Sequence, residues 1–457
     1  MSLVLLAERL RVGELSPREA ANEYLERIER LNPHLNAFIT LRAEEALAEA
    51  DSAPRGALYG VPLAVKDVID VAGMPTTAAS KILAGNVPRR DAECVRRLRA
   101  AGAVVVGKTN THEFAYGATT TSPHFGPARN PWLPERICGG SSGGSGAAVA
   151  ADLASGALGT DTAGSVRIPA CFCGVTGLRP SSGLVPVAGV VPVSSTFDVV
   201  GPLARTAQDC ALLLEVLANR RIELGAGVRG VRIGIVETLL ERAQRPVAEA
   251  VDVALRELVS LGASLEPVEL PLFEKAGVIQ QLVMLPEASE AHLPWLRSRL
   301  GDYGPDVRAR LLAGLFLPST AYVTGLHARR WYRDELDRVL DRIDLLAAPA
   351  MPIVAPPIGE DTVEIAGVRI PYRLALIPFN SPWSLAGLPA VSVPCGFVDG
   401  LPVGFALVGR QFEDAAVLTA AHAYQGATGW HLREPLDAGP AAALYTESGF
   451  RPKGGRS

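Results

Sequence analysis

Apolar residues in the first fifty positions recur at the spacing of amphipathic helices. The pattern predicts helix around Leu5 and Leu10 and again from the Ser16-Pro17 pair to Ile28, with a further helix after Thr40. We therefore expect residues 1–55 to form a helical N-terminal segment whose main role is packing.

From Gly60 the pattern changes to short apolar strands alternating with helices. The run GVPLAVKDVID (60–70) predicts a strand, residues 89–101 predict a charged helix, and residues 103–107 predict a second strand. A run of small residues from Gly146 to Leu153 predicts a tightly packed helix, and residues 157–160 predict the next strand. This order is a βαβ-like rhythm, which is typical of α/β folds.

The second half of the chain repeats this rhythm and adds a long helical stretch. Residues 231–236 and 264–270 predict strands on either side of a helix over residues 246–261. Residues 272–340 predict helices rich in aromatic side chains, which suits a cap over a pocket. Three further buried strands are predicted, over residues 345–352, 390–397 and 402–409.

Composition limits the classes of partner. The chain has 457 residues, of which 48% are hydrophobic, so it is long enough to bury a large core. Its formal net charge is −4 and it has no Lys/Arg block, so neither nucleic acid nor a membrane surface is expected as a partner. The chain has no run of ~18 apolar residues and no basic segment before its first apolar stretch. We expect a soluble, cytoplasmic protein that acts on a small molecule.

Neither the six cysteines nor the seven histidines are spaced like a metal site. The cysteines form no CxxC and no disulfide framework, which favours free thiols in a reducing compartment; a metal or redox role for Cys171 and Cys173 is the weaker alternative. HExxH is absent, and the histidines show no ligand spacing. We therefore expect no metal and no cofactor.

Two glycine-rich motifs lack the context that their usual chemistry requires. Gly225, Gly227 and Gly230 spell GxGxxG, but the apolar strand follows the last glycine instead of preceding the first. The GxSxG match at 139–143 has no strand before it, because two prolines interrupt RNPWLPERI. We assign neither a dinucleotide site nor a nucleophile elbow.

Two serine-bearing segments have the composition of a hydrolase site. Ser141 lies in GGSSGGSGAAVA (139–150), at the start of a predicted helix, and Ser165 lies in GTDTAGSVRIPA (159–170), just past a predicted strand. Successive backbone N–H groups in such a turn form an anion-binding nest, which could hold the oxyanion formed when a serine attacks a carbonyl. Each segment alone could also be an ordinary Gly/Ser turn.

Lys66 is a candidate base for such a serine. It lies in an otherwise apolar strand, where a lysine is uncommon because an ammonium is costly to bury. Burial lowers the pKa of a lysine toward the range in which the amine can act as a general base. The alternative is a strand-end lysine that pairs with Asp67 or Asp70.

Together these segments closely resemble the amidase signature family. The resemblance covers nearly the whole chain, through GVPLAVKD, CGGSSGGSGAAVA, GTDTAGSVRIPACFCGVTGLRPS, GKTNTHEFAYG (107–117), FGPARNPW (125–132), GPLARTAQD (201–209) and LAGLPAVSVPCG (385–396). It implies that Ser165 is the acyl-accepting nucleophile, Ser141 the bridging serine and Lys66 the base. It further implies that Ser142 hydrogen-bonds and orients Lys66, and that the Gly140-Ser141 peptide is cis.

The resemblance also implies an architecture. We expect an α/β fold with a large mixed, mostly parallel central sheet, helices on both of its faces and a helical cap around residues 272–340. No linker divides the halves, so we expect one domain over residues 1–457. Its parts would be the helical segment 1–55, a catalytic core over 56–220, a C-terminal half with the cap over 221–448, and a frayed tail over 449–457. Family members often pair, which leaves a homodimer open.

Backbone groups after the second strand complete the expected site. The N–H groups of Thr162, Ala163, Gly164 and Ser165 are the predicted oxyanion hole. Ala163 stands where the family more often has glycine, but it keeps its N–H.

Four side chains are expected to support the site or contact the substrate. Arg167 is expected to anchor the loop to Asp161 or to a carbonyl rather than to bind substrate, whereas Tyr116 and Arg329 are candidate substrate contacts.

The substrate is the main open question at this stage. The rival to a self-contained amidohydrolase is the glutamine-hydrolysing A subunit of glutamyl-tRNA(Gln) amidotransferase, which needs an arginine for the α-carboxylate of glutamine and an acid for its α-ammonium. Arg329 falls roughly where that arginine would be, but ALIPFNSPWS (375–384) contains no Asp or Glu. We therefore favour hydrolysis of a small or aromatic carboxamide to a carboxylate and ammonia or an amine.

Overall fold

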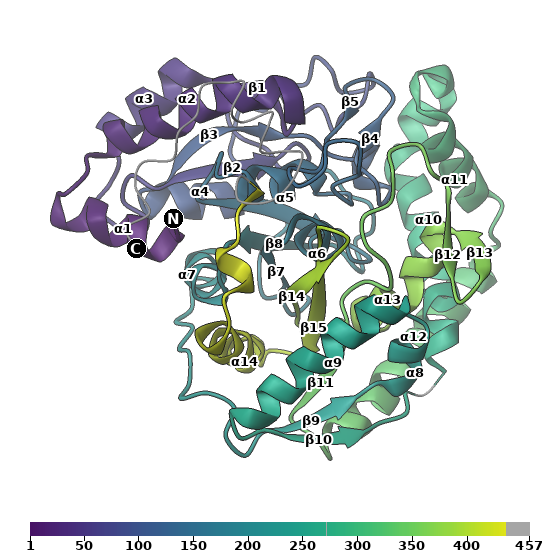
Figure 1. The fold of residues 1–457 in the computed structure, drawn as a ribbon. Helices are drawn as coiled ribbons and strands as arrows, with labels where there is room; N and C mark the ends of the chain where they lie inside the picture. Colours follow the sequence, from purple (N-terminus) through teal and green to yellow (C-terminus); the bar gives the residue numbers. More distant parts are fainter. Residues whose placement is uncertain (271, 436–457) are drawn as a thin grey trace.

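A computed structural model describes residues 1–270 and 272–435. Within these residues, 11 strands form one continuous sheet in the order β1-β3-β2-β6-β8-β7-β14-β15-β11-β9-β10, with helices packed around it (Figure 1). The tail predicted to fray, 449–457, lies outside the described residues.

The strands of the main sheet come from both halves of the chain. They are β1 (Phe38–Leu41), β2 (Pro62–Lys66), β3 (Val104–Thr109), β6 (Gly156–Asp161), β7 (Thr176–Arg179), β8 (Val199–Ala204), β9 (Arg232–Ile235), β10 (Ser264–Pro267), β11 (Leu345–Pro349), β14 (Ala390–Val398) and β15 (Leu401–Val408). Two small hairpins accompany them, β4 (Thr121–Ser122) with β5 (Gly126–Pro127), and β12 (Thr362–Ile365) with β13 (Val368–Pro371).

The prediction of a mixed sheet is confirmed, but the prediction that it is mostly parallel is wrong. Among the described strands, six of the ten neighbouring pairs are antiparallel. The parallel pairs lie on the two flanks, where helices connect the strands. The centre, β8-β7-β14-β15, is antiparallel, because β14 and β15 are joined by a tight turn at Asp399-Gly400 rather than by a crossover helix.

The helical N-terminal segment is confirmed, with one strand inserted in it. It contains α1 (Leu3–Val12), α2 (Pro17–Leu35) and α3 (Ala43–Asp51), with β1 between the last two. Ser16 and Glu19 form a capping box at the start of α2, and Pro17 occupies the first helical position, so the start of α2 is determined locally.

The remaining helices surround the sheet. They are α4 (Glu93–Ala100), α5 (Gly143–Ala150), α6 (Arg167–Cys173), α7 (Ala207–Ala218), α8 (Glu237–Glu241), α9 (Arg245–Ser260), α10 (Phe273–Ser298), α11 (Pro305–Leu315), α12 (Ser319–Leu340), α13 (Tyr372–Ala386) and α14 (Asp414–Ala427), with short 3₁₀ turns at Glu113–Ala115, Leu300–Asp302 and Trp430–Leu432. The last two α-helices and the β12-β13 hairpin were not predicted from the sequence.

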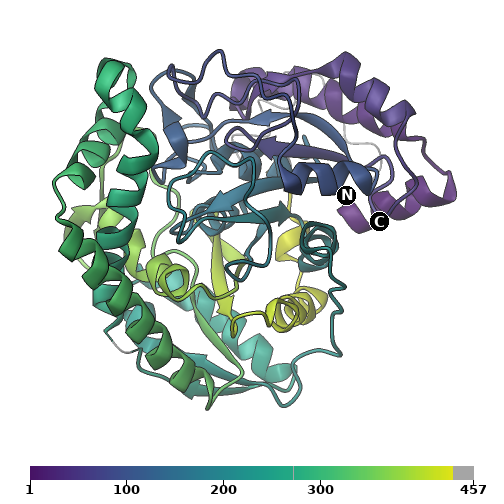
Figure 2. The same ribbon diagram turned by 180° about the vertical axis from the view of Figure 1, so that it is seen from behind.

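The predicted helical stretch over residues 272–340 is confirmed as α10, α11 and α12. These helices stand beside α13 along one side of the molecule (Figures 1 and 2). Among the described residues no single helix has both the length and the apolarity that a membrane crossing requires; α11 and α12 reach them only together and meet at 97°.

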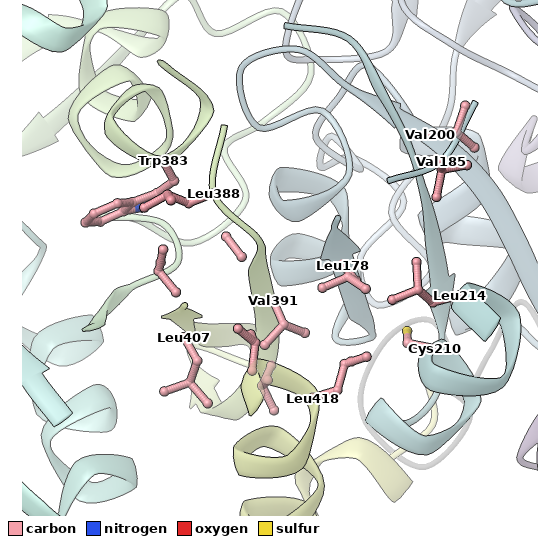
Figure 3. Close-up of a cluster of buried hydrophobic side chains, with 14 of the residues drawn as sticks. Leu178, Val185, Val200, Cys210, Leu214, Trp383, Leu388, Val391, Leu407 and Leu418 are labelled. Carbon is pink, nitrogen blue, oxygen red and sulfur yellow. The ribbon is translucent and has the colours of Figure 1, made fainter. Parts of the chain in front are cut away.

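The hydrophobic core lies between the central strands and the helices that cover them. Figure 3 shows Leu178, Val391 and Leu407 from the sheet close to Leu214, Leu418 and Trp383 from the flanking helices. This core spans strands of both halves, so it fixes the N-terminal half, which carries the serine segments, against the C-terminal half.

Candidate active site

Lys66 is the last residue of β2, and its ammonium group is buried among hydroxyl groups. Its Nζ lies 2.7 Å from Ser141 Oγ and 2.7 Å from Thr160 Oγ1. Burial lowers the pKa of Lys66 to about 7, although the negative charges of Asp198 and Asp161 oppose the shift. A substantial fraction of this amine is therefore neutral at neutral pH.

The alternative role for Lys66, a strand-end ion pair, is wrong. Asp67 instead pairs with Lys108, whose Nζ lies 3.0 Å from its Oδ1 in an equally buried position. Asp67 also accepts hydrogen bonds from the backbone N–H and the hydroxyl of Thr77. Within the described residues, Lys66 forms no ion pair with a carboxylate.

Ser141 is held in place by its backbone. The Gly140-Ser141 peptide is cis, as the resemblance implies. A Cβ on Gly140 would lie 2.7 Å from the backbone nitrogen of Thr119, so any larger residue at this position would clash with that backbone. The carbonyl of Ser141 accepts hydrogen bonds from the backbone N–H of His112 and from the hydroxyls of Thr111 and Thr120.

The expected bond from Ser142 to Lys66 is not formed. The hydroxyl of Ser142, which precedes α5, donates to the carbonyl of Thr160 at 3.2 Å and accepts the N–H of Thr160 at 3.3 Å. Ser142 thus fixes the backbone of β6 at Thr160, and the Thr160 side chain makes the contact with Lys66. Thr160 was not singled out from the sequence; β2 pairs with β6 up to Val65 and Leu158, and the side chains of Lys66 and Thr160 meet just beyond these paired residues.

Ser165 lies in the turn between β6 and α6. Gly164 before it has φ +113°, and a Cβ there would lie 2.5 Å from Asn380 Oδ1, so this position requires glycine. The backbone N–H of Ser142 donates to the carbonyl of Ser165 at 3.1 Å, which joins the two serine segments. The hydroxyls of Ser141 and Ser165 form no direct hydrogen bond in the part of the chain described, so the two serines are linked through backbone.

The turn that carries Ser165 is organised around Asp161. Arg167 binds both carboxylate oxygens of Asp161 at 3.0 Å, and Arg179 approaches Oδ1 at 3.1 Å. Burial alone would raise the pKa of Asp161, but the charges of the two arginines outweigh it and hold the pKa below its ordinary value. Arg167 thus anchors the loop, as predicted.

The predicted oxyanion hole is smaller than expected. Asp161 Oδ1 accepts the N–H of Gly164 at 2.8 Å, so this donor is already used. The N–H groups of Thr162, Ala163 and Ser165 donate to no protein acceptor within the described residues, and all three residues line a cavity. These three groups remain available to an oxyanion.

The cavity over Ser165 has a volume of about 70 Å³. Its walls come from the loop after β3, from the Ser165 turn and from the helices α10, α11 and α13; they include Tyr116, Thr162, Ala163, Ser165, Ile168, Gln281, Met284, Arg310, Arg373, Leu376, Ile377 and Ser381. Tyr116, predicted as a substrate contact, is among them.

Arg329 is not part of this cavity, so its prediction as a substrate contact is not supported. It lies on α12, donates to the carbonyl of Leu385 at 3.0 Å and stacks over Phe197. Arg310 and Arg373 line the cavity instead. No sequence motif pointed to them, because they come from separate helices of the C-terminal half.

Two further contacts connect the Ser165 turn to its surroundings. Gln280 on α10 donates to the carbonyl of Thr162 at 2.9 Å, and the hydroxyl of Thr162 donates to Asp198 at 2.5 Å. The cap helix α10 therefore holds the backbone that presents the free N–H groups. No cluster of His, Cys, Asp or Glu side chains that could hold a metal ion occurs among the described residues.

Comparisons with known proteins agree on one family. The model of the Amidase family matches residues 19–418. The A subunit of glutamyl-tRNA(Gln) amidotransferase from Roseiflexus sp. (strain RS-1) is 39% identical over 94% of this chain and 96% of its own length. A solved amidase structure has a TM-score of 0.90 at 38% identity, covering 94% of this chain and 100% of that one. The corresponding A subunit from Thermotoga maritima has a TM-score of 0.76 at 37% identity, covering 89% and 91%.

Proposed function

The chain belongs to the amidase family and acts on amide C–N bonds, and from this premise we propose that it hydrolyses a small-molecule carboxamide to a carboxylate and ammonia through an acyl-enzyme on Ser165. In this proposal Ser165 is the nucleophile, Ser141 relays the proton and Lys66 is the base. We also propose that residues 1–457 act as one domain, since a single sheet takes strands from both halves.

Attack and proton transfer proceed together in the proposed mechanism. Ser165 Oγ, which forms no hydrogen bond with Ser141 in the described structure, must first turn toward Ser141 Oγ. It then forms a bond to the amide carbon while its proton passes to Ser141 Oγ, whose own proton passes to the neutral Nζ of Lys66. When the tetrahedral intermediate collapses, the C–N bond breaks and the same path returns the proton to the leaving nitrogen, which departs as ammonia. Water then attacks the ester carbon, and its proton passes through Ser141 to Lys66. When the C–O bond to Ser165 breaks, this proton returns to Ser165 Oγ and the acid leaves.

Charge on the carbonyl oxygen is balanced by the backbone. As the tetrahedral intermediate forms, the oxygen becomes an anion and is held by the N–H groups of Thr162, Ala163 and Ser165. Such a donor contributes roughly 10²–10³ in rate, because it is already oriented before charge develops.

One observation carries this proposal. Lys66 is buried, its pKa is lowered to about 7, and its amine is hydrogen-bonded to Ser141 at 2.7 Å. Among the described residues, the only side-chain partners of Lys66 are two hydroxyls, so no carboxylate offsets the cost of burying its charge. A lysine with a purely structural role would not need this environment, whereas a general base does.

The second candidate is a glutamine-hydrolysing subunit that delivers ammonia to a partner. It is favoured by the curated relatives, since those at 36–39% identity are named as the A subunit of glutamyl-tRNA(Gln) amidotransferase. Against it, no Asp or Glu lies among the described residues that line the Ser165 cavity, so the ammonium of glutamine would have no carboxylate partner there. An unmade hydrogen bond to a charged group costs on the order of 1.5–3 kcal/mol.

An assay of the isolated chain separates the two candidates. We expect ammonia release from benzamide or propionamide without any partner, and activity that falls by at least about 10⁴-fold in Ser165→Ala and Lys66→Ala because the three groups act as a unit. Ser141→Ala should keep a small residual rate. Ser195→Ala, an exposed serine outside this cavity, is the matched control.

Opposite results would be equally clear. Full activity in Lys66→Ala would remove the base from the mechanism, and a chain that a serine-directed phosphonylating reagent does not label at Ser165 would not be a serine hydrolase. Ammonia released from glutamine only after amidotransferase partner subunits are added would establish the second candidate.

A further inference from the structure

Gln280 connects the cap helix α10 to the turn that carries Ser165. Its side chain is fully buried, and its Nε2 donates to the carbonyl of Thr162 at 2.9 Å. Gln280 does not belong to the described lining of the Ser165 cavity, whereas Thr162 and Ala163 do. Its amide therefore contacts the backbone of the turn from outside the walls that a substrate would touch.

The peptide that Gln280 contacts also carries a free donor. In a trans peptide the C=O and the following N–H lie in one plane and point in opposite directions, so a hydrogen bond to the carbonyl of Thr162 also fixes the direction of the Ala163 N–H. Among the described residues only Gly140-Ser141 is cis, so this geometry applies here. The Ala163 N–H donates to no described protein acceptor and is one of the groups available to an oxyanion.

A second contact holds the side chain of Thr162. Its hydroxyl donates to Asp198 Oδ1 at 2.5 Å, and Asp198 Oδ2 accepts the backbone N–H groups of Val193 and Ser194 at 2.8 and 3.0 Å. Thr162 is thus fixed through its hydroxyl by the loop before β8 and through its carbonyl by α10. Within the described residues, the bond from Gln280 is the only hydrogen bond to that carbonyl.

The other end of the Gln280 amide has no partner. Its Oε1 is buried and accepts no hydrogen bond from the described residues. A buried carbonyl oxygen without a donor lowers the stability of a fold, so packing alone would favour an apolar side chain of similar size here. The useful part of this side chain is therefore its donor end, which contacts Thr162.

Helix α10 provides a fixed base for Gln280. A Cβ on Gly277, one turn before Gln280, would lie 2.2 Å from Ile377 Cγ2 on α13, so the two helices approach each other closely there. Farther along α10, the hydroxyl of Ser289 donates to the carbonyl of Leu311 on α11 at 2.6 Å. Because α10 is held by both neighbouring helices, a donor attached to it is already in place before charge develops.

We propose that Gln280 is a positioning residue for the reaction at Ser165: from the cap helix it holds the carbonyl of Thr162 and thereby orients the N–H of Ala163 toward the oxyanion. This inference rests on the proposed acyl transfer to Ser165. The bond also polarises the peptide, because hydrogen bonds in a chain strengthen one another, so the Ala163 N–H becomes a stronger donor. Gln280 contributes when the carbonyl oxygen becomes an anion, and so it raises kcat rather than the affinity for the uncharged amide.

Gln280→Met tests this role, because methionine is unbranched, adapts to irregular space and carries no donor. With benzamide as the substrate, we expect kcat to fall about 10- to 100-fold, less than for a complete oxyanion donor, and KM to change less than about 2-fold. Isothermal titration calorimetry with phenylboronic acid, whose boron becomes tetrahedral on a serine hydroxyl, should show a similar loss of affinity. Benzamide should bind Ser165→Ala equally well with and without Gln280→Met.

A purely structural role would give a different result. Ser289→Ala is the matched control, since it removes another buried donor of α10 that does not contact the Ser165 turn. We expect Ser289→Ala to lower the unfolding temperature and to keep kcat and the affinity for phenylboronic acid. Gln280→Met should unfold near the wild-type temperature, because it also removes the unpartnered Oε1. Gln280→Leu is a second apolar replacement and should behave as Gln280→Met does.

The outcomes distinguish this inference from the proposed function. Unchanged kcat in Gln280→Met, an equal loss of benzamide affinity in the Ser165→Ala background, or an equal loss of kcat in Ser289→Ala would overturn the positioning role. Hydrolysis by the wild-type chain that depends on Ser165 would leave the proposed hydrolysis intact in each of these cases. If the wild type bound phenylboronic acid at Ser165 but released no ammonia from benzamide, the proposed substrate would be wrong. The affinities of the wild type and Gln280→Met for phenylboronic acid would still decide the positioning role.

Discussion

Two lysines on neighbouring strands show how partners determine what burial does. Lys66 on β2 and Lys108 on β3 are both fully buried, and burial lowers the pKa of each. Lys108 faces the carboxylate of Asp67 at 3.0 Å, whereas Lys66 faces the hydroxyls of Ser141 and Thr160. A carboxylate retains a lysine in its charged form, and hydroxyls accept either form, so only Lys66 is suited to exchange protons.

The pH dependence of hydrolysis should report this difference. A base must be unprotonated to accept a proton, and the unprotonated fraction of Lys66 rises with pH through its pKa of about 7. We therefore expect kcat/KM to rise about 10-fold per pH unit below pH 7 and to level off above it. Steady-state rates from pH 5 to 9 would check this; a flat profile would contradict the assignment of Lys66 as the base.

The same two lysines should respond in opposite directions to replacement by methionine. The pKa of Lys66 is about 7 in the folded chain and 10.5 as the ordinary value, so the unfolded chain binds more protons between these values. Lys66 therefore destabilises the fold most below pH 7, and this destabilisation becomes smaller as pH rises toward 10.5. At pH 7, Lys66→Met should raise the free energy of unfolding by about 2–4 kcal/mol, after the loss of two hydrogen bonds.

Lys108→Met should instead lower the free energy of unfolding by about 3–5 kcal/mol, because it leaves Asp67 as an unpaired buried charge. Urea-induced unfolding of both variants beside the wild type gives the comparison. If both substitutions destabilised the chain equally, burial of Lys66 would not destabilise the fold, and the lowered pKa that the proposed base needs would not be supported.

Among the helices and strands, the sequence predicted correctly those features that depend on residues close together in the chain. The parallel pairs β2-β3 and β9-β10 follow the strand-helix-strand rhythm in the sequence. The central antiparallel strands were misjudged, although Asp399-Gly400 between two apolar runs is a strong hairpin signal, and both residues have positive φ. The rhythm of the flanks does not extend to the centre, because no helix separates β7 from β8 or β14 from β15.

The helix after Ser141 shows why a boundary was missed. The sequence predicts a helix from Gly146, but α5 begins at Gly143. Glycines disfavour helix, so propensity argues for a later start. Packing decides otherwise: a Cβ on Gly144 would lie 2.4 Å from the carbonyl oxygen of Ala37 and 2.5 Å from the backbone of Asn110. The glycines are there to let the helix approach other backbone closely, which no local pattern reveals.

The residues of the candidate site also fall into two groups, those that local motifs reveal and those that only the tertiary fold brings together. Lys66, Ser141 and Ser165 lie in compact motifs whose composition is unusual in itself, so the sequence was enough to name them. Arg310 and Arg373 lie on two helices far along the chain, and only the tertiary fold brings them to the cavity of Ser165.

At the scale of the whole molecule, one buried charge cluster joins the two halves. Asp161 at the end of β6 binds Arg167 on α6 and Arg179 on β7. Arg167 continues to α13, where it donates to Ser384 Oγ at 2.7 Å and to the carbonyl of Asn380 at 3.4 Å. The cluster therefore connects the turn of Ser165 with the helix that carries Arg373.

Removing the charge of Asp161 should weaken the fold in a pH-dependent way. Asp161→Asn leaves two buried guanidiniums without their carboxylate, so we expect the free energy of unfolding at pH 7 to fall by about 3–5 kcal/mol. Because the folded pKa of Asp161 lies below its ordinary value of 3.8, its contribution is complete above about pH 4 and declines as pH falls toward the folded pKa. The difference between wild type and variant should therefore stay constant from pH 5 to 8 and shrink below pH 4.

Asp344→Asn provides the matched comparison, because Asp344 also pairs with an arginine, Arg232 at 2.9 Å, but on the surface. An exposed pair contributes less than about 1 kcal/mol, and salt screens it, so this variant should unfold almost as the wild type does. Urea unfolding of both variants at pH 7 and pH 3 measures the contrast. Equal losses in the two variants would mean that the Asp161 cluster does not bind the halves together, and the position of the Ser165 turn against α13 would need another cause.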